Sequence, residues 1–191
     1  MNKTIIIILV VIVIIFIITW IGYPYTRRKI LRKMALDVFE ILDKNDIEYW
    51  TDFGTLLGII RENDIILYDN DVDISIIDNE NNRSKMVDVA KSAKEKGYKL
   101  NYYDLGIYRI EKYIYFTDLI LYKLDDDIYK NISPIEFPNI PKKYINPIID
   151  YVWEKENITI KVPNDVHNAL VWRYGDDYMT PKRGVKGVVN I

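Results

Sequence analysis

The sequence begins with an apolar run that a water-soluble domain does not expose. Residues 5–18 read IIIILVVIVIIFII, and Thr19, Trp20 and Ile21 extend the run. As an α-helix, residues 5–21 would be about 26 Å long, close to the hydrocarbon thickness of a thin bilayer. The mixed, charged sequence that follows contains no second run of this kind. The pattern therefore predicts a membrane anchor in residues 1–25, with one transmembrane helix, and a single domain in residues 26–191.

A cleaved signal peptide is the alternative interpretation of the apolar run. The run is long for a signal peptide, and Tyr23-Pro24-Tyr25 lacks the small residues of a cleavage site, which favours a retained anchor. Lys3 precedes the run, whereas a basic cluster follows it: Arg27, Arg28, Lys29, Arg32 and Lys33. The positive-inside rule would place the domain in the cytoplasm.

Composition excludes several classes of site. The chain has 26 Lys and Arg against 28 Asp and Glu, a net charge of −2, so nucleic acid is not an expected partner. It has no cysteine, which excludes disulfides, zinc fingers and iron–sulfur clusters. His167 is the single histidine, which disfavours histidine metal clusters and Ser-His-Asp triads. Catalysis would therefore depend on carboxylates, Lys, Arg and hydroxyl groups.

Hydrophobic periodicity predicts an α/β (α+β) domain with a mixed sheet flanked by helices. Helices are expected at residues 27–45, 54–61, 83–96 and 164–174. Strands are expected at residues 47–51, 65–68, 72–77, 99–103, 107–110, 113–122 and 158–162. Residues 124–148 contain four prolines and are expected to be irregular.

The stretch Tyr68-Asp-Asn-Asp-Val-Asp-Ile-Ser-Ile-Ile77 carries the most chemical information. On a strand, Asp71, Asp73 and Ser75 would share one face, and the aliphatic residues between them would face the core. Two carboxylates on one face repel each other unless a cation lies between them, and Mg²⁺ or Mn²⁺ prefers oxygen ligands. A solvated acidic turn is the simpler reading of an isolated Asp-x-Asp.

Two neighbouring features favour a metal site over an acidic turn. Gly54-Thr55 begins an expected helix, where backbone N–H groups and a hydroxyl can approach a phosphate, although an ordinary capped helix would look the same. Asp118 lies within the apolar strand Tyr115–Ile120 and needs a partner there, either a Lys or Arg or a metal ion. Together the three features form the pattern of a nucleotidyltransferase-type metal site.

At this point the sequence resembles the LicD/fukutin family. The resemblance rests on WTDFGTLLGIIRENDIILYDNDVDISII, residues 50–77, and on a closing YGDDYMTP segment, residues 174–181. It matches the family motif at Gly54, Thr55, Leu56, Leu57, Gly58, Arg61, Ile65, Asp69, Asp71 and Asp73. Tyr178 stands where the family usually has Trp, and the chain is short for a fukutin-type enzyme.

The resemblance implies a nucleotidyltransferase fold that transfers phosphocholine, ribitol phosphate or a similar phospho-alcohol. The donor would be a CDP-linked alcohol and the acceptor a glycan or glycoprotein hydroxyl. Asp71 and Asp73 would bind Mg²⁺ or Mn²⁺, and Asp118 would be a third ligand or the base for the acceptor. Gly54 and Thr55 would hold a donor phosphate. Arg61 would neutralise the diphosphate, or form a structural ion pair.

Two other functions compete with this reading. A catalytically silent, LicD-like protein could act as a scaffold that binds a partner in a glycosylation complex. A nucleotidyltransferase acting on RNA or protein is a third reading, which the anchor and the near-neutral charge disfavour. The family resemblance places the domain in the secretory-pathway or Golgi lumen, against the charge rule, and we expect the lumen.

Overall fold

The computed structural model describes residues 2–103, 106–133 and 137–181. Its α-helices are α1 (Lys3–Ile17), α2 (Tyr23–Lys44), α3 (Phe53–Glu62), α4 (Glu80–Glu95), α5 (Lys142–Ile145) and α6 (Val166–Tyr174). Its strands are β1 (Tyr49–Thr51), β2 (Val72–Ile77), β3 (Lys99–Tyr103), β4 (Ile107–Lys112), β5 (Tyr115–Asp125), β6 (Ile128–Asn131), β7 (Ile140–Pro141), β8 (Ile149–Trp153) and β9 (Ile158–Val162).

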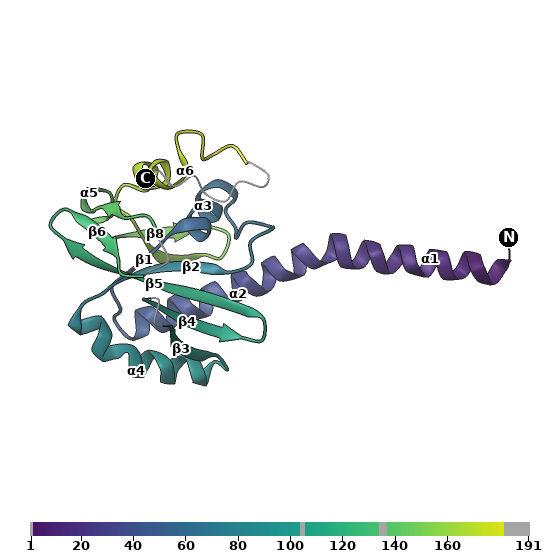
Figure 1. Ribbon diagram of the computed structural model, residues 1–191, viewed down its shortest axis with the longest axis horizontal. Helices are drawn as coiled ribbons and strands as arrows, with labels where there is room; N and C mark the ends of the chain where they lie inside the picture. Colours follow the sequence, from purple (N-terminus) through teal and green to yellow (C-terminus); the bar gives the residue numbers. More distant parts are fainter. Residues whose placement is uncertain (1, 104–105, 134–136, 182–191) are drawn as a thin grey trace.

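One continuous helix runs from the apolar segment into the domain. A π-helical turn, Ile18–Gly22, joins α1 to α2, so that helical backbone extends from Lys3 to Lys44. The first part projects away from the domain, as Figure 1 shows, and none of the α1 side chains is buried. This is the one helix of the described residues that is long and apolar enough to cross a membrane. The second part buries an apolar stripe: Leu31, Met34, Ala35, Val38, Phe39, Ile41 and Leu42.

The main sheet is mixed and is centred on a parallel pair. Its strand order is β1-β2-β5-β4-β3, with β6 paired to the second half of β5 and β7 paired to β6. β2 and β5 are parallel, and the other pairs are antiparallel. The crossover between the parallel strands contains α4, β3 and β4. β8 and β9 form a separate hairpin.

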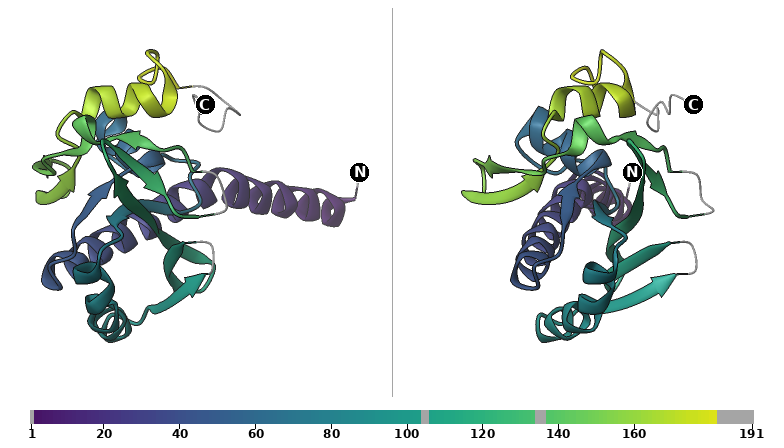
Figure 2. Two further views of the ribbon diagram at one scale, coloured as in Figure 1. Left: turned by 60° about the vertical axis from the view of Figure 1, so that its left-hand side comes forward. Right: turned by 90° about the vertical axis from the view of Figure 1, so that its left-hand side faces the viewer.

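Helices cover both faces of this sheet. In Figures 1 and 2, α2 and α4 lie on one side of the sheet and α3 and α6 lie on the other. The α2 side holds much of the apolar core, in which Val72, Ile74 and Ile76 of β2 are fully buried. The alternation expected for this strand is therefore confirmed. A smaller cluster around Trp50, Ile120 and other residues contacts the α6 side.

The predicted fold class is confirmed, and several local predictions are wrong. Residues 65–68 are not a strand: residues 65 and 66 have no regular structure, and residues 67 and 68 form a turn in which the amide of Asp69 donates to the carbonyl of Ile66 at 3.1 Å. The stretch predicted to be irregular contains β6, β7 and α5. Strand β8 was not predicted from the sequence. The long helix predicted to begin at residue 27 begins at Tyr23, so the proposed boundary at residue 25 falls inside it.

Candidate active site

The predicted carboxylates lie together at the beginning of the parallel strands. Asp73 is in register with Asp118 on the neighbouring strand, and adjacent strands are about 4.8 Å apart. Asp71 directly precedes β2 at the same end. Asp73 shares its face of β2 with Ser75, whose hydroxyl donates to Asp52 at the start of α3. Asp118 shares its face of β5 with Ile120, which packs in one cluster with Ala169 of α6. The structure therefore places Asp73 beside Asp118 and Asp71 at the same end of β2, and their role as metal ligands stays a prediction.

The electrostatics of this group centre on Asp73. Burial, followed by the negative charges of Asp71, Asp69 and Asp118, raises the pKa of Asp73 well above its ordinary value. Burial and the charge of Asp71 likewise raise the pKa of Asp69 to about 6, while Arg27 acts in the opposite direction. Like charges are thus concentrated at one point, which is the condition under which a bound cation stabilises a site.

Helix α3 begins against this carboxylate group. Phe53, its first residue, has a positive φ of 46°, and Asp52 caps the helix by accepting from the Phe53 amide. A Cβ at Gly54 would lie 2.8 Å from Oδ2 of Asp69, so glycine permits this carboxylate to lie against the helix. Thr55 is buried, and its Oγ1 accepts from the amide of Asp73 at 2.8 Å. The predicted phosphate-binding residues are therefore in direct contact with the predicted metal-binding loop and strand.

Asp118 has a partner that the sequence analysis left open. Arg109 of β4 donates from Nε to Oδ1 at 2.6 Å and from Nη2 to Oδ2 at 2.8 Å. The guanidinium also lies 3.8 Å from the centre of the Phe116 ring. Of the two partners considered for Asp118, the structure shows the arginine. A role as third metal ligand stays a prediction.

Arg61 lies at the far end of α3, beside the same group. Its side chain is 11% exposed, pairs with Glu62 at 2.8 Å and donates to the carbonyl of Tyr178 at 3.4 Å. Its Nε is buried and has no hydrogen-bond partner among the described residues. Its charge also lowers the pKa of Asp69. Arg61 therefore forms an ion pair, with Glu62, and its Nε donor has no partner among the described residues.

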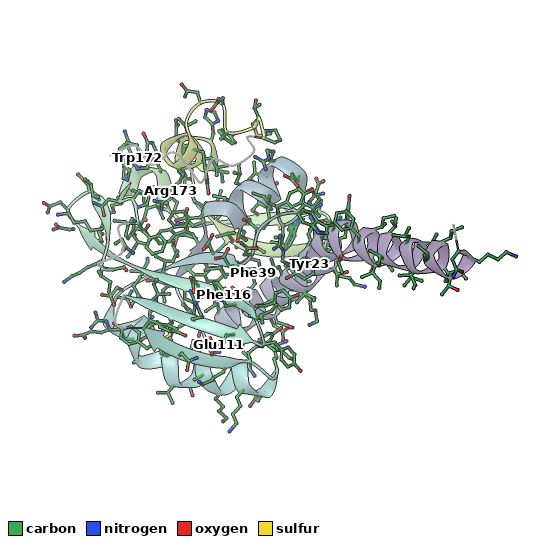
Figure 3. All side chains as sticks on the ribbon, turned by 45° about the vertical axis from the view of Figure 1, so that its right-hand side comes forward. Tyr23, Phe39, Glu111, Phe116, Trp172 and Arg173 are labelled. Atoms are coloured by element: carbon green, nitrogen blue, oxygen red, sulfur yellow. The ribbon has the colours of Figure 1, made fainter. Side chains whose placement is uncertain are left out.

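A buried ion pair beneath the site was missed. Asp52 accepts from Nε and Nη2 of Arg173 in α6, at 3.2 and 2.6 Å, and both residues are at most 3% exposed. Asp52 also accepts from Nε1 of Trp50 and from the hydroxyl of Ser75. Figure 3 shows Arg173 on α6, beside Trp172. The helix-capping position of Asp52 was the available sequence signal; nothing local identified Arg173 as its partner.

Two further residues near the carboxylates were not singled out. The charge of Asp73 contributes, after burial, to a raised pKa of Tyr174, which places the end of α6 beside the site. Arg27, in the second turn of α2, donates from Nη1 to the side-chain oxygen of Asn70. The long helix therefore contacts the loop that carries Asp69 and Asp71.

Asp71 and Asp73 are the donors that a hard divalent cation would have at this site. Among the described residues no three His, Asp or Glu side chains converge closely enough to hold a metal ion unaided. Mg²⁺ is usually bound by one or two carboxylates, with waters and substrate phosphates as its other ligands. Asp71 and Asp73, whose neighbours crowd negative charge around them, fit that arrangement.

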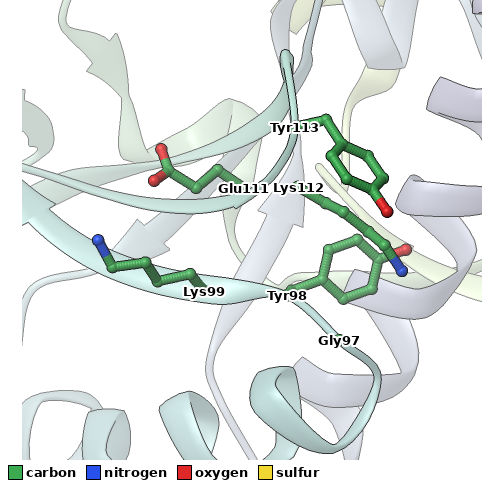
Figure 4. Close-up of a pocket in the computed structure, with 6 residues that line it drawn as sticks. All are labelled: Gly97, Tyr98, Lys99, Glu111, Lys112 and Tyr113. Carbon is green, nitrogen blue, oxygen red and sulfur yellow. The ribbon is translucent and has the colours of Figure 1, made fainter.

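A separate open hollow of about 350 Å³ lies at the end of β3 and β4. It is lined by Gly97, Tyr98, Lys99, Glu111, Lys112 and Tyr113, as Figure 4 shows. None of the predicted site residues lines it.

Comparison with known proteins assigns the domain and shows its fold. Residues 46–165 match the profile of "LicD/FKTN/FKRP, nucleotidyltransferase domain". An uncharacterized protein of Rickettsia typhi is 27% identical over 131 residues, which are 69% of this chain and 38% of that protein. An uncharacterized protein of Rickettsia prowazekii is 35% identical over 72 residues, 38% of this chain and 26% of that protein. The chain thus spans less than half the length of these relatives. The solution structure of the antibiotic-resistance factor ANT(2″)-Ia superposes with a TM-score of 0.50 and 12% identity, covering 76% of this chain and 70% of that one.

Proposed function

The chain belongs to the LicD/FKTN/FKRP nucleotidyltransferase-domain family, and we propose that it is a metal-dependent transferase of phospho-alcohols. The family and the fold indicate a transferase of the nucleotidyltransferase type. The donor we propose is a CDP-linked alcohol, such as CDP-choline or CDP-ribitol, and the acceptor is a glycan hydroxyl.

One observation carries this proposal: Asp73 is in register with Asp118 and donates its amide to Thr55 of α3, and Asp71 directly precedes β2 at the same end. In the proposed reaction the acceptor oxygen forms a bond to the phosphorus that carries the alcohol. The bond from that phosphorus to the oxygen of CMP breaks, and CMP leaves. The acceptor hydroxyl gives up its proton, for which a carboxylate is the available base. Catalysis is then mainly positioning and neutralisation of charge.

The residues divide these tasks. Asp71 and Asp73 would hold Mg²⁺ or Mn²⁺, which when bound would neutralise the diphosphate and polarise the reacting phosphoryl group. Arg61, with one buried donor left over, would supply further positive charge to the diphosphate. Gly54 and Thr55 would bring the N–H groups of α3 near a donor phosphate. Asp118, held by Arg109, would accept the acceptor proton or complete the metal site.

We further propose that α1 anchors the domain to a membrane as a single span, with the domain on the lumenal side. The support is one exposed helix of the required length and hydropathy. Protease treatment of sealed vesicles tests the orientation: a lumenal domain is protected until detergent is added, whereas a cytoplasmic domain is digested at once.

The deciding assay measures CMP release by the full chain. The protein in lipid nanodiscs is given Mn²⁺, a glycan acceptor and CDP-choline, CDP-ribitol or CDP-glycerol in turn. Asp71→Asn with Asp73→Asn should abolish release while the circular dichroism spectrum is unchanged. Asp125→Asn with Asp126→Asn, at the opposite end of β5, is the matched control and should release CMP normally. No release with any donor, together with no Mn²⁺ binding by calorimetry, would favour the silent scaffold.

A further inference from the structure

Two exposed turns lie at the end of the domain from which the long helix emerges. Tyr113 and Ile114, in the connection of β4 to β5, are 91% and 70% exposed. Tyr68, in the loop from α3 to β2, is 68% exposed. Outside the apolar segment, Val87 at 78% and Tyr25 of α2 at 60% are the large apolar side chains of the described residues that come nearest to these values. We call Tyr68, Tyr113 and Ile114 the exit rim.

Contacts fix both turns beside the beginning of α2. Burial, followed by the neighbouring Tyr23 side chain, raises the pKa of Tyr115, which directly follows the β4–β5 connection, so this connection lies beside the start of α2. Asn70, two residues after Tyr68, accepts from Arg27. Tyr23 is the first residue of α2, and Arg27 lies one turn later with its guanidinium 5.4 Å from the centre of the Tyr23 ring. Figure 1 shows both connections at the end of the sheet that faces α1.

The height of these contacts matches the polar zone of a bilayer. Tyr23 and Arg27 lie about 3 and 9 Å along the helix axis from the end of the apolar run at residue 21. The headgroup zone of a bilayer is about 5–8 Å thick on each side of the hydrocarbon. When residues 5–21 span the hydrocarbon, Tyr23 therefore lies within this zone and Arg27 at its outer edge, so the turns beside these two residues lie near the level of the headgroups.

The chemistry of the exit rim also suits this zone. Tyrosine combines an apolar ring with a hydroxyl and is enriched at membrane interfaces, where Trp20, Tyr23 and Tyr25 of the helix would also lie. Figure 4 shows Tyr113 at the edge of the β4–β5 turn, next to Lys112. A tyrosine beside a lysine meets both the apolar and the anionic parts of a lipid surface.

We propose that the exit rim is a lipid-docking surface, which inserts into the membrane interface beside the anchor and holds the domain against the bilayer. This inference rests on the proposed membrane anchor. A lipid surface is the occupant indicated because the rim lies beside Tyr23 and Arg27, directly after the exposed apolar segment of the helix. Docking would place the Asp69–Asp73 loop, which contacts the same part of α2, next to the lipid headgroups.

The absence of cysteine makes a direct test possible. Full-length Tyr68→Cys, Tyr113→Cys and Val87→Cys are labelled with the fluorophore NBD and placed in nanodiscs of phosphatidylcholine and phosphatidylglycerol. The Val87 label is the control, because Lys85 contacts the carbonyl of Asp46, about 35 Å along the helix direction from Tyr23. We expect labels at 68 and 113 to show blue-shifted emission and several-fold stronger quenching by headgroup nitroxide lipids than the label at 87.

A label at Phe16→Cys separates the two proposals. Quenching of this label by nitroxides deep in the bilayer, with labels at 68 and 113 no more quenched than at 87, would overturn docking and leave the anchor intact. No deep quenching of the label at 16 would overturn both. An unlabelled readout is tryptic cleavage after Lys112, which should be faster for Tyr113→Ser with Ile114→Ser than for the wild type in the same nanodiscs, when each rate is divided by the rate in detergent. Equal cleavage rates would also contradict docking.

Discussion

Replacement of Arg173 by methionine tests how much the buried ion pair between Arg173 of α6 and Asp52 stabilises the fold. The guanidinium is 3% exposed and is the counter-ion of Asp52, which is 1% exposed. It also donates to the carbonyl of Pro138 and to the hydroxyl of Tyr122, and lies 4.2 Å from the centre of the Phe53 ring. Methionine retains the apolar stem and fills a similar length. The substitution therefore removes the charge and the donors with little change in volume.

The expected loss in the free energy of unfolding follows from the Asp52 carboxylate, which stays buried without its counter-ion. Asp52 would keep the indole, amide and hydroxyl donors but would lose its only cationic partner among the described residues. Removing one member of a buried pair typically costs about 3–5 kcal/mol. For a domain of this size each kcal/mol lowers the melting temperature by about 2–4 °C, so we expect a decrease of about 6–20 °C.

Thermal unfolding of the full chain in detergent, followed by circular dichroism, measures this cost. Asp52→Asn combined with Arg173→Met should be markedly more stable than Arg173→Met alone, because no unpaired charge is then buried. Lys130→Met, which removes an exposed partner of Asp125, is the control and should melt close to the wild type. A loss below about 1 kcal/mol for Arg173→Met, or no recovery in the double variant, would refute the reasoning.

Three other expectations concern the site and its support. Gly58→Ala should lower the free energy of unfolding by about 1–3 kcal/mol, measured by urea titration, because its Cβ would lie 2.6 Å from the Asp64 carbonyl; an unchanged midpoint would contradict this close contact. Asp37→Asn should lower stability at pH 7 and flatten its decline in acid: burial raises the pKa of Asp37, but hydrogen bonds from Lys and Tyr side chains outweigh it and lower the pKa overall, so the wild type loses this contribution as pH falls below about 4. If the stability of the wild type and of Asp37→Asn changed equally with pH, the pKa of Asp37 would not be lowered in the folded protein. Asp118→Asn should slow CMP release about tenfold or more and weaken Mn²⁺ binding less than Asp73→Asn does, because Arg109 already holds both Asp118 oxygens; equal losses of Mn²⁺ affinity would make Asp118 a metal ligand.

Strand periodicity was sufficient to predict that Asp73 and Asp118 lie on strands, but not how the two strands pair. Alternation in β2 placed Asp73 on the face opposite its aliphatic neighbours, and the apolar sequence around Asp118 placed it on a buried strand. That these two strands are adjacent and parallel did not follow from periodicity, because pairing is decided by the α4-β3-β4 crossover and by packing on α2.

Whether Arg109 falls opposite Asp118 is decided by the position of the turn between β4 and β5. The sequence suggested a turn at Glu111-Lys112, whereas the chain reverses at Tyr113-Ile114, where Tyr113 has a positive φ of 59°. Non-glycine residues adopt this conformation uncommonly, so turn chemistry gave no signal. With the hairpin register of the structure, Arg109 falls opposite Asp118. An error of two residues in a turn was therefore enough to hide the ion pair.

The single helix that links the apolar run to the domain has a consequence for biosynthesis. Helix α2 is made before any strand, yet its apolar stripe is covered by β2, β5 and α4, which are made later. During synthesis of an anchored chain, this amphipathic helix would emerge beside the bilayer with its stripe uncovered. Amphipathic helices rest in the membrane interface under such conditions. The membrane surface would then cover Leu31 and Met34 until the sheet packs against them. Folding would thus transfer the apolar face of α2 from lipid to protein.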